Sequence, residues 1–445
     1  MPETLNSESV LTKSRRIAWL AMQNPQMAFT SLNHHLDVGW LREAFQRVRK
    51  DGAPGIDGQT WHDYEANLES NLQSLLNRAK SGTYRAPPVR RVYIPKGGSS
   101  TETRPIGIPS IEDKVLQRAV AMLLEAIYEC DFYVCSYGFR RGRSAHQALD
   151  SLWNQSTNGR IRWILDVDVR KFFDTLDHRH LRELLQLRVR DGMILRLIGK
   201  WLNAGVMEDG AVHHPNAGSP QGGVISPILA NVYLHYVLDQ WFHEVVLPRL
   251  RGSAFLIRFA DDFVIGFTDE QDARRVLDVV PKRFAKYGLA IHPDKTRLVP
   301  FGKPREQKGS PEPAKPGTFD FLGFTHYWGR SRRKTWVIKR KTASSRLSRS
   351  LHAIWTWCRS NRHLPLATQH AALSQKLRGH YQYYGITGNS ASLGSFEQGA
   401  IRAWFKWLRR RHRDRPPWTW FQRQLARYPL PRPTIAHSIY RVAKG

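Results

Sequence analysis

Cysteine is scarce in this sequence, with three residues among 445. Cys130, Cys135 and Cys358 are too few and too scattered for a disulfide framework or a zinc site, and they fit a reducing compartment. Long apolar runs are lacking too, since no stretch approaches a membrane span and the N-terminus has no apolar signal-peptide core. We therefore expect a soluble, cytoplasmic protein with no membrane partner, and the length suggests two or three domains.

Acidic residues are also few, at 38 against 68 Lys and Arg, which leaves a net charge of +30. Such an excess points to a polyanionic partner. Residues 327–445 hold 25 Lys and Arg against two acids, Glu397 and Asp414, a net of +23, together with eight of the fifteen Trp. Basic residues interleaved with aromatics suit phosphate neutralisation and base stacking. A basic helical domain with core tryptophans is the alternative.

Two of the few acids stand side by side in an apolar run. Residues 257–265 are apolar except for Arg258, Asp261 and Asp262. The run predicts two short strands that turn at Asp261 and Asp262. Adjacent carboxylates repel each other unless a cation compensates them. A polar turn would explain a lone Asp-Asp pair equally well.

A second acidic strand lies upstream, over residues 163–174. On a strand, Asp166 and Asp168 point to one face, while Leu165, Val167 and Val169 point to the other. Asp168, Asp261 and Asp262 together offer hard oxygen ligands for two Mg²⁺ ions. Two such ions stabilise both the attacking and the leaving oxygen of an in-line phosphoryl displacement.

Three further segments could contact a nucleotide. Residues 91–109 predict a hairpin with Lys96 and Arg104 on opposing arms, suited to a triphosphate or else an exposed basic edge. The glycine-rich loop 218–227 contains Gln221, a donor and acceptor for a nucleotide. Phe172 and Phe173 follow the Asp168 strand, where a ring could exclude a 2′-hydroxyl or simply pack in the core.

Apolar periodicity predicts helices between these segments, including one that begins with a capping box from Ser110 to Asp113. The expected helices cover residues 41–50, 68–79, 110–127, 145–153, 181–202, 228–238 and 272–286, and a basic helical region extends from 336 to about 415.

In this order, the blocks resemble the reverse transcriptase and maturase proteins encoded by bacterial group II introns. The resemblance covers nearly the whole chain, and residues 377–385 are similar to the maturase, or X, domain. The matching blocks are residues 52–58, 91–109, 137–144, 166–174, the Gln221 loop, 259–262, 289–295, 321–323, 377–385, 428–433 and 437–440.

The resemblance implies an α+β, right-hand polymerase. Fingers and palm with an antiparallel palm sheet would occupy residues 1–330, and a helical thumb or maturase domain 331–445. The implied roles are metal binding by Asp168, Asp261, Asp262 and the Val169 carbonyl; nucleotide binding by Lys96, Arg104, Phe173 and Gln221; a primer grip of Phe321, Leu322, Gly323 and Phe324; and RNA binding by Arg141, Arg143, Arg378 and Tyr383.

The same resemblance implies the partners: a group II intron RNA, an RNA or DNA template with a DNA primer, deoxynucleoside triphosphates and two Mg²⁺ ions. A homodimer is left open, as is association with the nucleoid. The sequence departs from the family at Phe259, where Tyr is more common, and it ends at Gly445 without a His-Asn-His nuclease. We therefore expect priming from nascent DNA strands instead of target cleavage.

Three functions compete. The first is RNA-directed DNA synthesis with assistance to intron splicing and retrohoming. The second is a pure RNA-binding splicing factor, which the intact set of carboxylates disfavours. The third is a host-adopted reverse transcriptase in DNA repair or phage defence, which flanking DNA with or without an intron RNA would distinguish.

Overall fold

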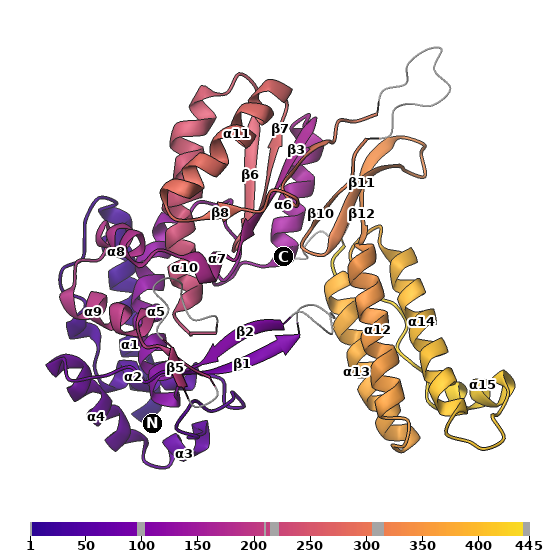
Figure 1. The fold of residues 1–445 in the computed structure, drawn as a ribbon, viewed down its shortest axis with the longest axis horizontal. Helices are drawn as coiled ribbons and strands as arrows, with labels where there is room; N and C mark the ends of the chain where they lie inside the picture. Colours follow the sequence, from indigo (N-terminus) through magenta and orange to yellow (C-terminus); the bar gives the residue numbers. More distant parts are fainter. Residues whose placement is uncertain (1, 96–102, 209–210, 214–221, 305–315, 439–445) are drawn as a thin grey trace. The chain divides into compact units, whose positions relative to one another are not determined.

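The computed structural model describes residues 2–95, 103–208, 211–213, 222–304 and 316–438 (Figure 1). It divides into two compact units. The first comprises residues 1–94, 102–148 and 165–298, and the second comprises residues 95–101, 149–164 and 299–445.

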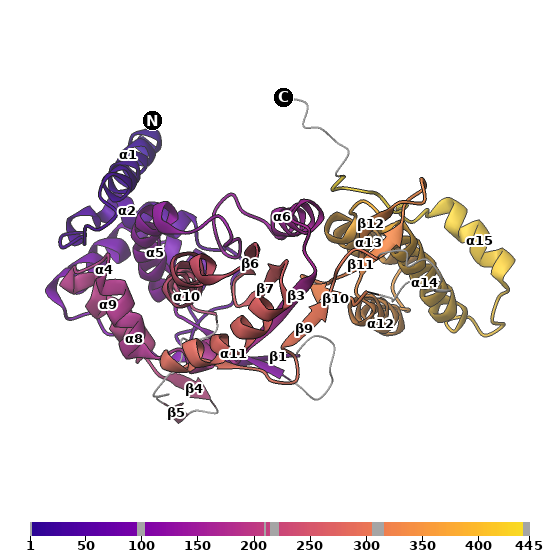
Figure 2. The same cartoon turned by 90° about the horizontal axis from the view of Figure 1, so that it is seen from above.

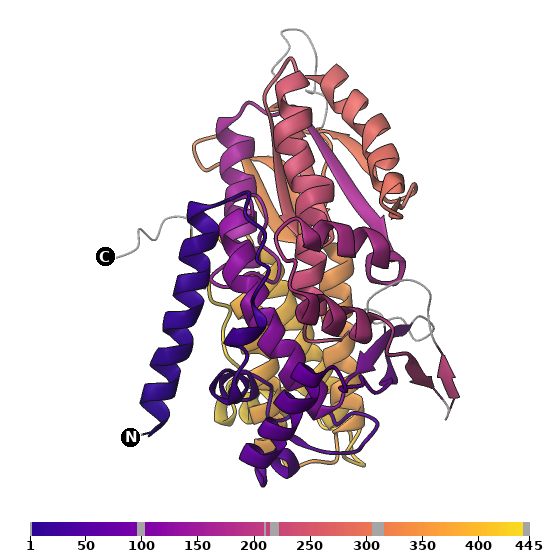
Figure 3. The ribbon, with the colours of Figure 1, turned by 90° about the vertical axis from the view of Figure 1, so that its left-hand side faces the viewer.

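The first unit is organised around α5 (Ile111–Asp131), whose apolar residues are buried. The helix α1 (Pro2–Gln23), indigo in Figure 3, packs on α5, as does α2. The other helices are α2 (Val38–Gln46), α3 (Trp61–Glu65), α4 (Leu68–Ser81), α7 (Phe172–Thr175), α8 (His178–Gln186), α9 (Gly192–Leu202), α10 (Ser226–Leu234) and α11 (Glu270–Lys286). Short 3₁₀ turns cover Asn33–His35 and Leu247–Arg249.

The predicted capping box at α5 is half formed. The Ser110 hydroxyl accepts a hydrogen bond from the Asp113 backbone N–H at 3.2 Å, as predicted. The Asp113 carboxylate, however, points into the core and accepts from the Tyr84 hydroxyl. The sequence therefore predicted the start of the helix correctly. The Asp113 side chain, however, bonds to a residue distant in the sequence and not to the Ser110 backbone.

The predicted helix over residues 181–202 is wrong as a single element. It is interrupted before Asp191, whose carboxylate accepts from the backbone N–H groups of Met193 and Ile194 and begins α9. An N-cap of this kind requires a non-helical residue, so the chain must leave one helix to start the next.

The larger sheet of the first unit positions the acidic residues. Its strand order is β6-β7-β3-β8, with β9 paired to β3, and α11 covers one face (Figure 2). The β6–β7 and β3–β8 pairs are antiparallel. The strands are β3 (Trp163–Arg170), β6 (Ala254–Phe259), β7 (Asp262–Phe267), β8 (Ala290–Ile291) and β9 (Arg297–Pro300).

Side chains alternate along β3 as predicted. Leu165, Val167 and Val169 are buried, whereas Asp166 and Asp168 are only partly buried. The apolar face anchors the strand, which leaves the acidic face open to other groups.

A smaller sheet contains the predicted hairpin at residues 91–109. Its order is β2-β1-β4-β5, and β1 and β4 are parallel. The strands are β1 (Val89–Pro95), β2 (Thr103–Ile108), β4 (Val206–Glu208) and β5 (Ala211–His213).

The second unit contains an antiparallel sheet, β10-β11-β12. Helix α6 packs there, because the Trp153 indole donates to the Ile338 carbonyl at 3.0 Å and Arg340 pairs with Asp150 at 3.0 Å. The prediction of helix from residue 336 onward is wrong for β12, where β11 supplies a pairing partner that periodicity cannot show. The elements are α6 (Ala145–Asn158), β10 (Phe319–Phe321), β11 (Phe324–Arg330) and β12 (Trp336–Thr342).

Four helices complete this unit around an apolar core that includes Leu373, Leu377 and Phe421. Trp404 is fully buried, and its indole donates to Gln369 at 3.0 Å. The helices are α12 (Ser344–Ser360), α13 (Leu366–Tyr384), α14 (Ser390–Arg409) and α15 (Trp418–Arg427), with α12 beside α14 (Figure 1). The predicted α+β class is confirmed. Among the described helices, none combines the length and apolarity that crossing a membrane requires.

Candidate active site

The turn between β6 and β7 lies one residue earlier than predicted. Phe259 pairs with Asp262 across the hairpin, so Ala260 and Asp261 form the turn and Asp262 begins β7. Ala260 has a φ of 58°. Two-residue hairpin loops favour positive φ at their first residue, which the apolar pattern alone could not locate. For a residue with a side chain, this conformation costs about 1–3 kcal/mol.

The sheet brings Asp261 toward Asp168, because β7 and β3 are neighbouring strands. Burial is the main cause that raises the pKa of Asp261; the Asp168 charge raises it further, and Arg104 opposes the shift. Arg104 lies on β2 and is exposed. The structure therefore gathers Asp168, Asp261 and Arg104 within electrostatic reach.

The carboxylates suit a divalent cation as a pair. Among the described residues, no three His, Cys, Asp or Glu side chains lie close enough together to hold a metal ion. Asp168 and Asp261 nevertheless provide hard oxygen donors whose repulsion a cation would relieve. Asp262 is exposed, and Val169 pairs with Ile291 of β8; their predicted metal roles stay predictions.

Two basic residues that sequence reasoning missed face the acidic side of β3. The Lys295 ammonium lies 3.4 Å from the Asp168 carboxylate, and the Arg297 guanidinium lies 3.1 Å from Asp166. Lys295 and Arg297 have the same two-residue spacing as Asp166 and Asp168. That matched spacing was the available signal. Both cations are more than half exposed, so each pair is worth little alone.

Lys96 and Gln221 lie outside the described residues. The next residue, Gly222, has a φ of 111°, and a Cβ there would lie 2.6 Å from the Gly107 carbonyl oxygen. At Gly222 the loop therefore approaches the backbone of β2 closely.

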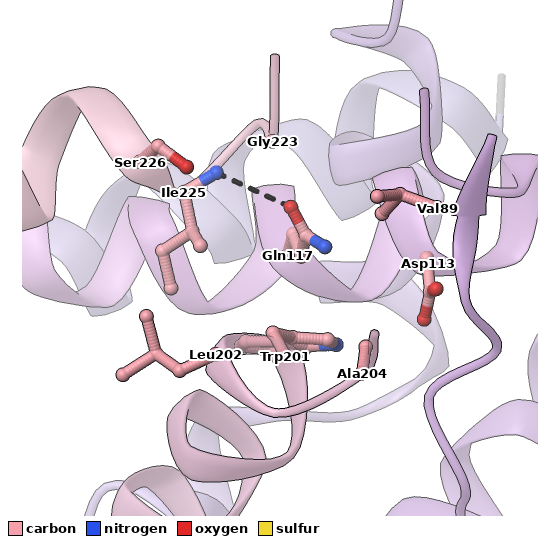
Figure 4. Close-up of a pocket in the computed structure, with 9 residues that line it drawn as sticks. All are labelled: Val89, Asp113, Gln117, Trp201, Leu202, Ala204, Gly223, Ile225 and Ser226. Atoms are coloured by element: carbon pink, nitrogen blue, oxygen red, sulfur yellow. Dashed lines mark hydrogen bonds between the residues drawn. The ribbon is translucent and has the colours of Figure 1, made fainter. Parts of the chain in front are cut away.

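A pocket is lined in part by the end of this loop, at Gly223, Ile225 and Ser226 (Figure 4). The Gln117 side chain accepts from the Ile225 backbone N–H at 3.4 Å and ties the segment to α5. None of the predicted site residues contributes to the lining. The lining residues are Val89, Asp113, Gln117, Trp201, Leu202, Ala204, Gly223, Ile225 and Ser226.

The two phenylalanines after β3 have different environments. Phe172 is 2% exposed and belongs to the core. Phe173 is only partly buried and packs edge-on against Phe172, with ring centroids 5.3 Å apart. Phe173 therefore keeps the accessible ring that its predicted role requires.

In the basic segment 137–144, Arg141 and Arg143 have different surroundings. Arg141 is exposed. The Arg143 guanidinium lies 5.4 Å from the centre of the Tyr137 ring. Their RNA contacts stay predictions.

In the second unit, the predicted primer grip is a tight turn between β10 and β11. Leu322 and Gly323 have φ of 50° and 82°, as a type I′ turn requires, and Phe321 and Phe324 are buried. The Tyr383 hydroxyl donates to the Leu322 carbonyl at 2.9 Å, and its ring lies 5.9 Å from that of Phe324. Tyr383 thus supports this turn.

The basic residues and tryptophans of the second unit differ in exposure. Arg378 is exposed on α13. Trp407 is buried, with the guanidinium groups of Arg359 and Arg410 at 5.8 and 4.9 Å from its ring. Trp404 and Trp407 are therefore core residues, as the alternative interpretation held, whereas Trp418 is 40% exposed.

Comparisons with known proteins agree with this site. Residues 94–326 match the model for "Reverse transcriptase (RNA-dependent DNA polymerase)". Protein YkfC of Escherichia coli is 38% identical over 283 residues, covering 56% of this chain and 74% of that protein. The group II intron-encoded protein LtrA of Lactococcus lactis is 37% identical over 241 residues, covering 54% of this chain and 39% of LtrA. The putative COX1/OXI3 intron 2 protein of Saccharomyces cerevisiae is 35% identical over 312 residues, covering 58% and 36%.

The chain thus spans less than half the length of the two intron proteins and about three quarters of YkfC. The matched region extends from the end of β1 into β11 and includes Asp168, Asp261 and Asp262. The chain therefore belongs to the reverse transcriptase family, that is, the RNA-directed DNA polymerases, and two of the relatives that it matches are named as intron proteins.

Proposed function

We propose that this protein binds a group II intron RNA, assists its splicing, and copies it into DNA during retrohoming. The observation that supports the catalytic part most directly is the approach of Asp168 to Asp261, with Arg104 nearby. Reverse transcriptases generally use divalent metal ions. Two Mg²⁺ ions, when bound, would stabilise the attacking and leaving oxygens of nucleotidyl transfer.

The chain's own residues would bind and orient the substrates. Asp168, Asp261 and Asp262 would hold the cations, with the Val169 carbonyl beside them. Lys96 and Arg104 would bind the triphosphate of the incoming deoxynucleotide, where the Arg fork can make two parallel hydrogen bonds. The remaining roles are sugar discrimination by Phe173, base-side contact by Gln221, and primer placement by Phe321, Leu322, Gly323 and Phe324.

We assign fingers and palm to residues 1–330 and a thumb or maturase domain to residues 331–445. That boundary falls in the turn between β11 and β12, inside the second compact unit. The β10-β11-β12 sheet would therefore belong structurally with the helices that follow it.

The proposed RNA partner rests on charge and on the relatives. Residues 327–445 have a net charge of +23, and two relatives are named as intron proteins. Arg141, Arg143 and Arg378 would contact RNA, and Tyr383 would do so through its ring, because its hydroxyl donates to the Leu322 carbonyl. The bacterial relatives favour a cytoplasmic location, with nucleoid association during DNA synthesis. A homodimer is compatible with this proposal.

Primer extension by the full-length chain on an RNA template tests the catalytic assignment. Asp261→Asn should lower extension by roughly 10³-fold, because metal ions supply several kcal/mol of transition-state stabilisation. RNA affinity should be retained. Asp294→Asn, on an exposed residue, is the matched control. Substantial DNA synthesis by Asp261→Asn with Mg²⁺ would overturn the catalytic assignment. Equal rates of intron splicing with and without the protein would overturn the maturase role.

A reverse transcriptase that works in DNA repair or phage defence without an intron is the second candidate. The observation in its favour is the coverage of 74% of YkfC, whose name mentions no intron. Sequencing the DNA around the gene separates the two, because only an intron-encoded protein is flanked by a catalytic intron RNA sequence.

A further inference from the structure

The Ala260–Asp261 turn is held by a buried polar network that no proposed catalytic role explains. Its centre is Arg258 on β6, in a strand that is otherwise apolar. Arg258, Asp239, Asn231 and Ser136 are each 0% exposed. Buried charges are costly unless they are paired and fully hydrogen-bonded, so the network needs a reason.

All five N–H donors of the Arg258 guanidinium have a protein acceptor. Two bind the carboxylate of Asp239, at 2.8 and 2.5 Å, and a third binds the Ser136 hydroxyl at 2.7 Å. The other two, both from one terminal nitrogen, bind the Asn231 side-chain oxygen and the Ala260 carbonyl, each at 3.0 Å. Arg258 thereby connects the core directly to the turn residue that has positive φ.

The same network fixes the segment that packs against the turn. The Asn231 amide donates to the Gly138 carbonyl at 2.8 Å. A Cβ on Gly138 would lie 2.3 Å from the Ala260 backbone nitrogen, so only glycine fits. Two groups therefore hold the strained Ala260 backbone. Gly138 packs against its nitrogen, and the Arg258 guanidinium donates to its carbonyl oxygen.

A local irregularity places Asp239. The α10 helix continues as π-helical turns over His235–Gln240 and Phe242–Val246. A π-helical turn contains more residues than an α-helical turn and changes which side chains face inward. Asp239 faces the core there, while Tyr236 and Gln240 are only partly buried.

We infer that the Arg258–Asp239 pair is a positioning device that holds Ala260 at positive φ and so aims Asp261 at Asp168. The inference rests on the proposed metal-binding role of Asp168 and Asp261. Arg258 and Asp239 touch neither substrate nor metal in this scheme. They act through the turn backbone.

The test compares two identical substitutions in the full-length protein, in two Arg–Asp pairs whose arginines are buried. Asp239→Asn removes the charge partner of Arg258, whereas Asp131→Asn does the same to Arg188, which is 3% exposed and pairs at 2.8 Å. Mn²⁺ binding is titrated by electron paramagnetic resonance without nucleotide, and the component that disappears in Asp261→Asn identifies the site. Primer-extension kcat and KM are measured alongside melting curves.

Asp239→Asn should weaken Mn²⁺ binding at this site and lower kcat by roughly 10–100-fold each, as removal of the groups that support metal ligands does, with KM for primer–template unchanged. Asp131→Asn should lower the melting temperature without either effect. Wild-type Mn²⁺ affinity and kcat in folded Asp239→Asn would overturn the inference, as would equal losses in Asp131→Asn. Unaltered Mn²⁺ binding in Asp261→Asn would instead overturn the proposed metal site.

A rescue variant distinguishes turn positioning from general stability. Glycine adopts positive φ without a side-chain penalty, so adding Ala260→Gly to Asp239→Asn should recover Mn²⁺ affinity by about fivefold. No recovery would exclude the turn as the route of action. If Asp239→Asn does not fold, Ser136→Ala removes a single Arg258 partner, with buried Ser156→Ala as its control. Equal Mn²⁺ affinity in these two serine variants would also overturn the inference.

Discussion

Phe173 illustrates how exposure separates two residues that the sequence treats alike. Its neighbour Phe172 fills the core, while Phe173 keeps part of its ring accessible beside the acidic strand. Phe173→Ala should therefore admit ribonucleotides, and the ratio of ribo- to deoxynucleotide incorporation should rise on the order of 10–100-fold. Single-turnover incorporation of matched nucleotide pairs measures this ratio.

Phe172→Ala serves as the control for that experiment. Loss of a fully buried ring costs about 3–5 kcal/mol, so this variant should melt at a lower temperature while its nucleotide ratio stays at the wild-type value. An unchanged ratio in folded Phe173→Ala would return Phe173 to a packing role.

Asp113 makes stability depend on pH. Burial is the largest cause that raises the pKa of Asp113 to about 8, whereas an unfolded Asp titrates near about 3.9. The folded chain therefore keeps a proton that the unfolded chain has lost. The contribution of the Asp113 carboxyl group to the free energy of unfolding is full below about pH 4 and declines as the pH rises toward 8.

Asp113→Asn should remove that decline, because the amide is neutral throughout and can still accept from Tyr84. Wild-type unfolding free energy, relative to the variant, should fall by several kcal/mol at most between pH 4 and pH 8. Urea unfolding at several pH values measures it, with exposed Asp278→Asn as the control. Parallel pH profiles for wild type and Asp113→Asn would contradict the prediction.

At the scale of single elements, α13 presents two residues with separate tasks. Tyr383 supports the Leu322–Gly323 turn, and Arg378 is exposed five residues earlier. Tyr383→Phe removes one hydrogen bond, worth about 1 kcal/mol, so KM for the primer should rise about fivefold while intron RNA affinity is unchanged. Arg378→Ala should instead weaken the affinity for intron RNA and leave KM for the primer unchanged. Filter-binding and extension assays on both variants check this, and a shared phenotype would contradict it.

Elements of the site were predictable where a local pattern determines them. The alternation in β3 placed Asp166 and Asp168 on the open face, and the capping Ser110 began α5. The β6–β7 turn was misplaced by one residue, since only the strand register shows that Phe259 pairs with Asp262. The π-helical turns left no periodic signal.

The supporting network lay beyond a sequence-based prediction for the same reason. Arg258 stands in an otherwise apolar strand, but its partners come from two other segments: Asn231 and Asp239 from α10 and its π-helical continuation, and Ser136 from the loop after α5. Their convergence depends on tertiary packing. Lys295 and Arg297, in contrast, could have been found from their spacing opposite Asp166 and Asp168.

At the scale of the whole molecule, charge and shape make different demands on RNA. The excess of positive charge over residues 327–445 predicts a long-range electrostatic attraction for any RNA. Intron recognition must add contacts that depend on folded RNA shape, such as stacking and 2′-hydroxyl recognition. Exposed cations away from Arg378 test the first property separately from the second.

Arg402, Arg413 and Arg423 are exposed cations on or near α14 and α15. Changing all three to Gln should weaken intron RNA and an unrelated structured RNA equally. For every phosphate that one of these cations neutralises, its removal should reduce the salt slope by roughly 0.7–0.9. Arg378→Ala should instead weaken the intron RNA more than the unrelated RNA at every salt concentration. Affinities measured from low to high salt decide the matter: equal losses for both RNAs in Arg378→Ala would leave only a charged surface, because a shape-specific contact must discriminate between RNAs of equal charge.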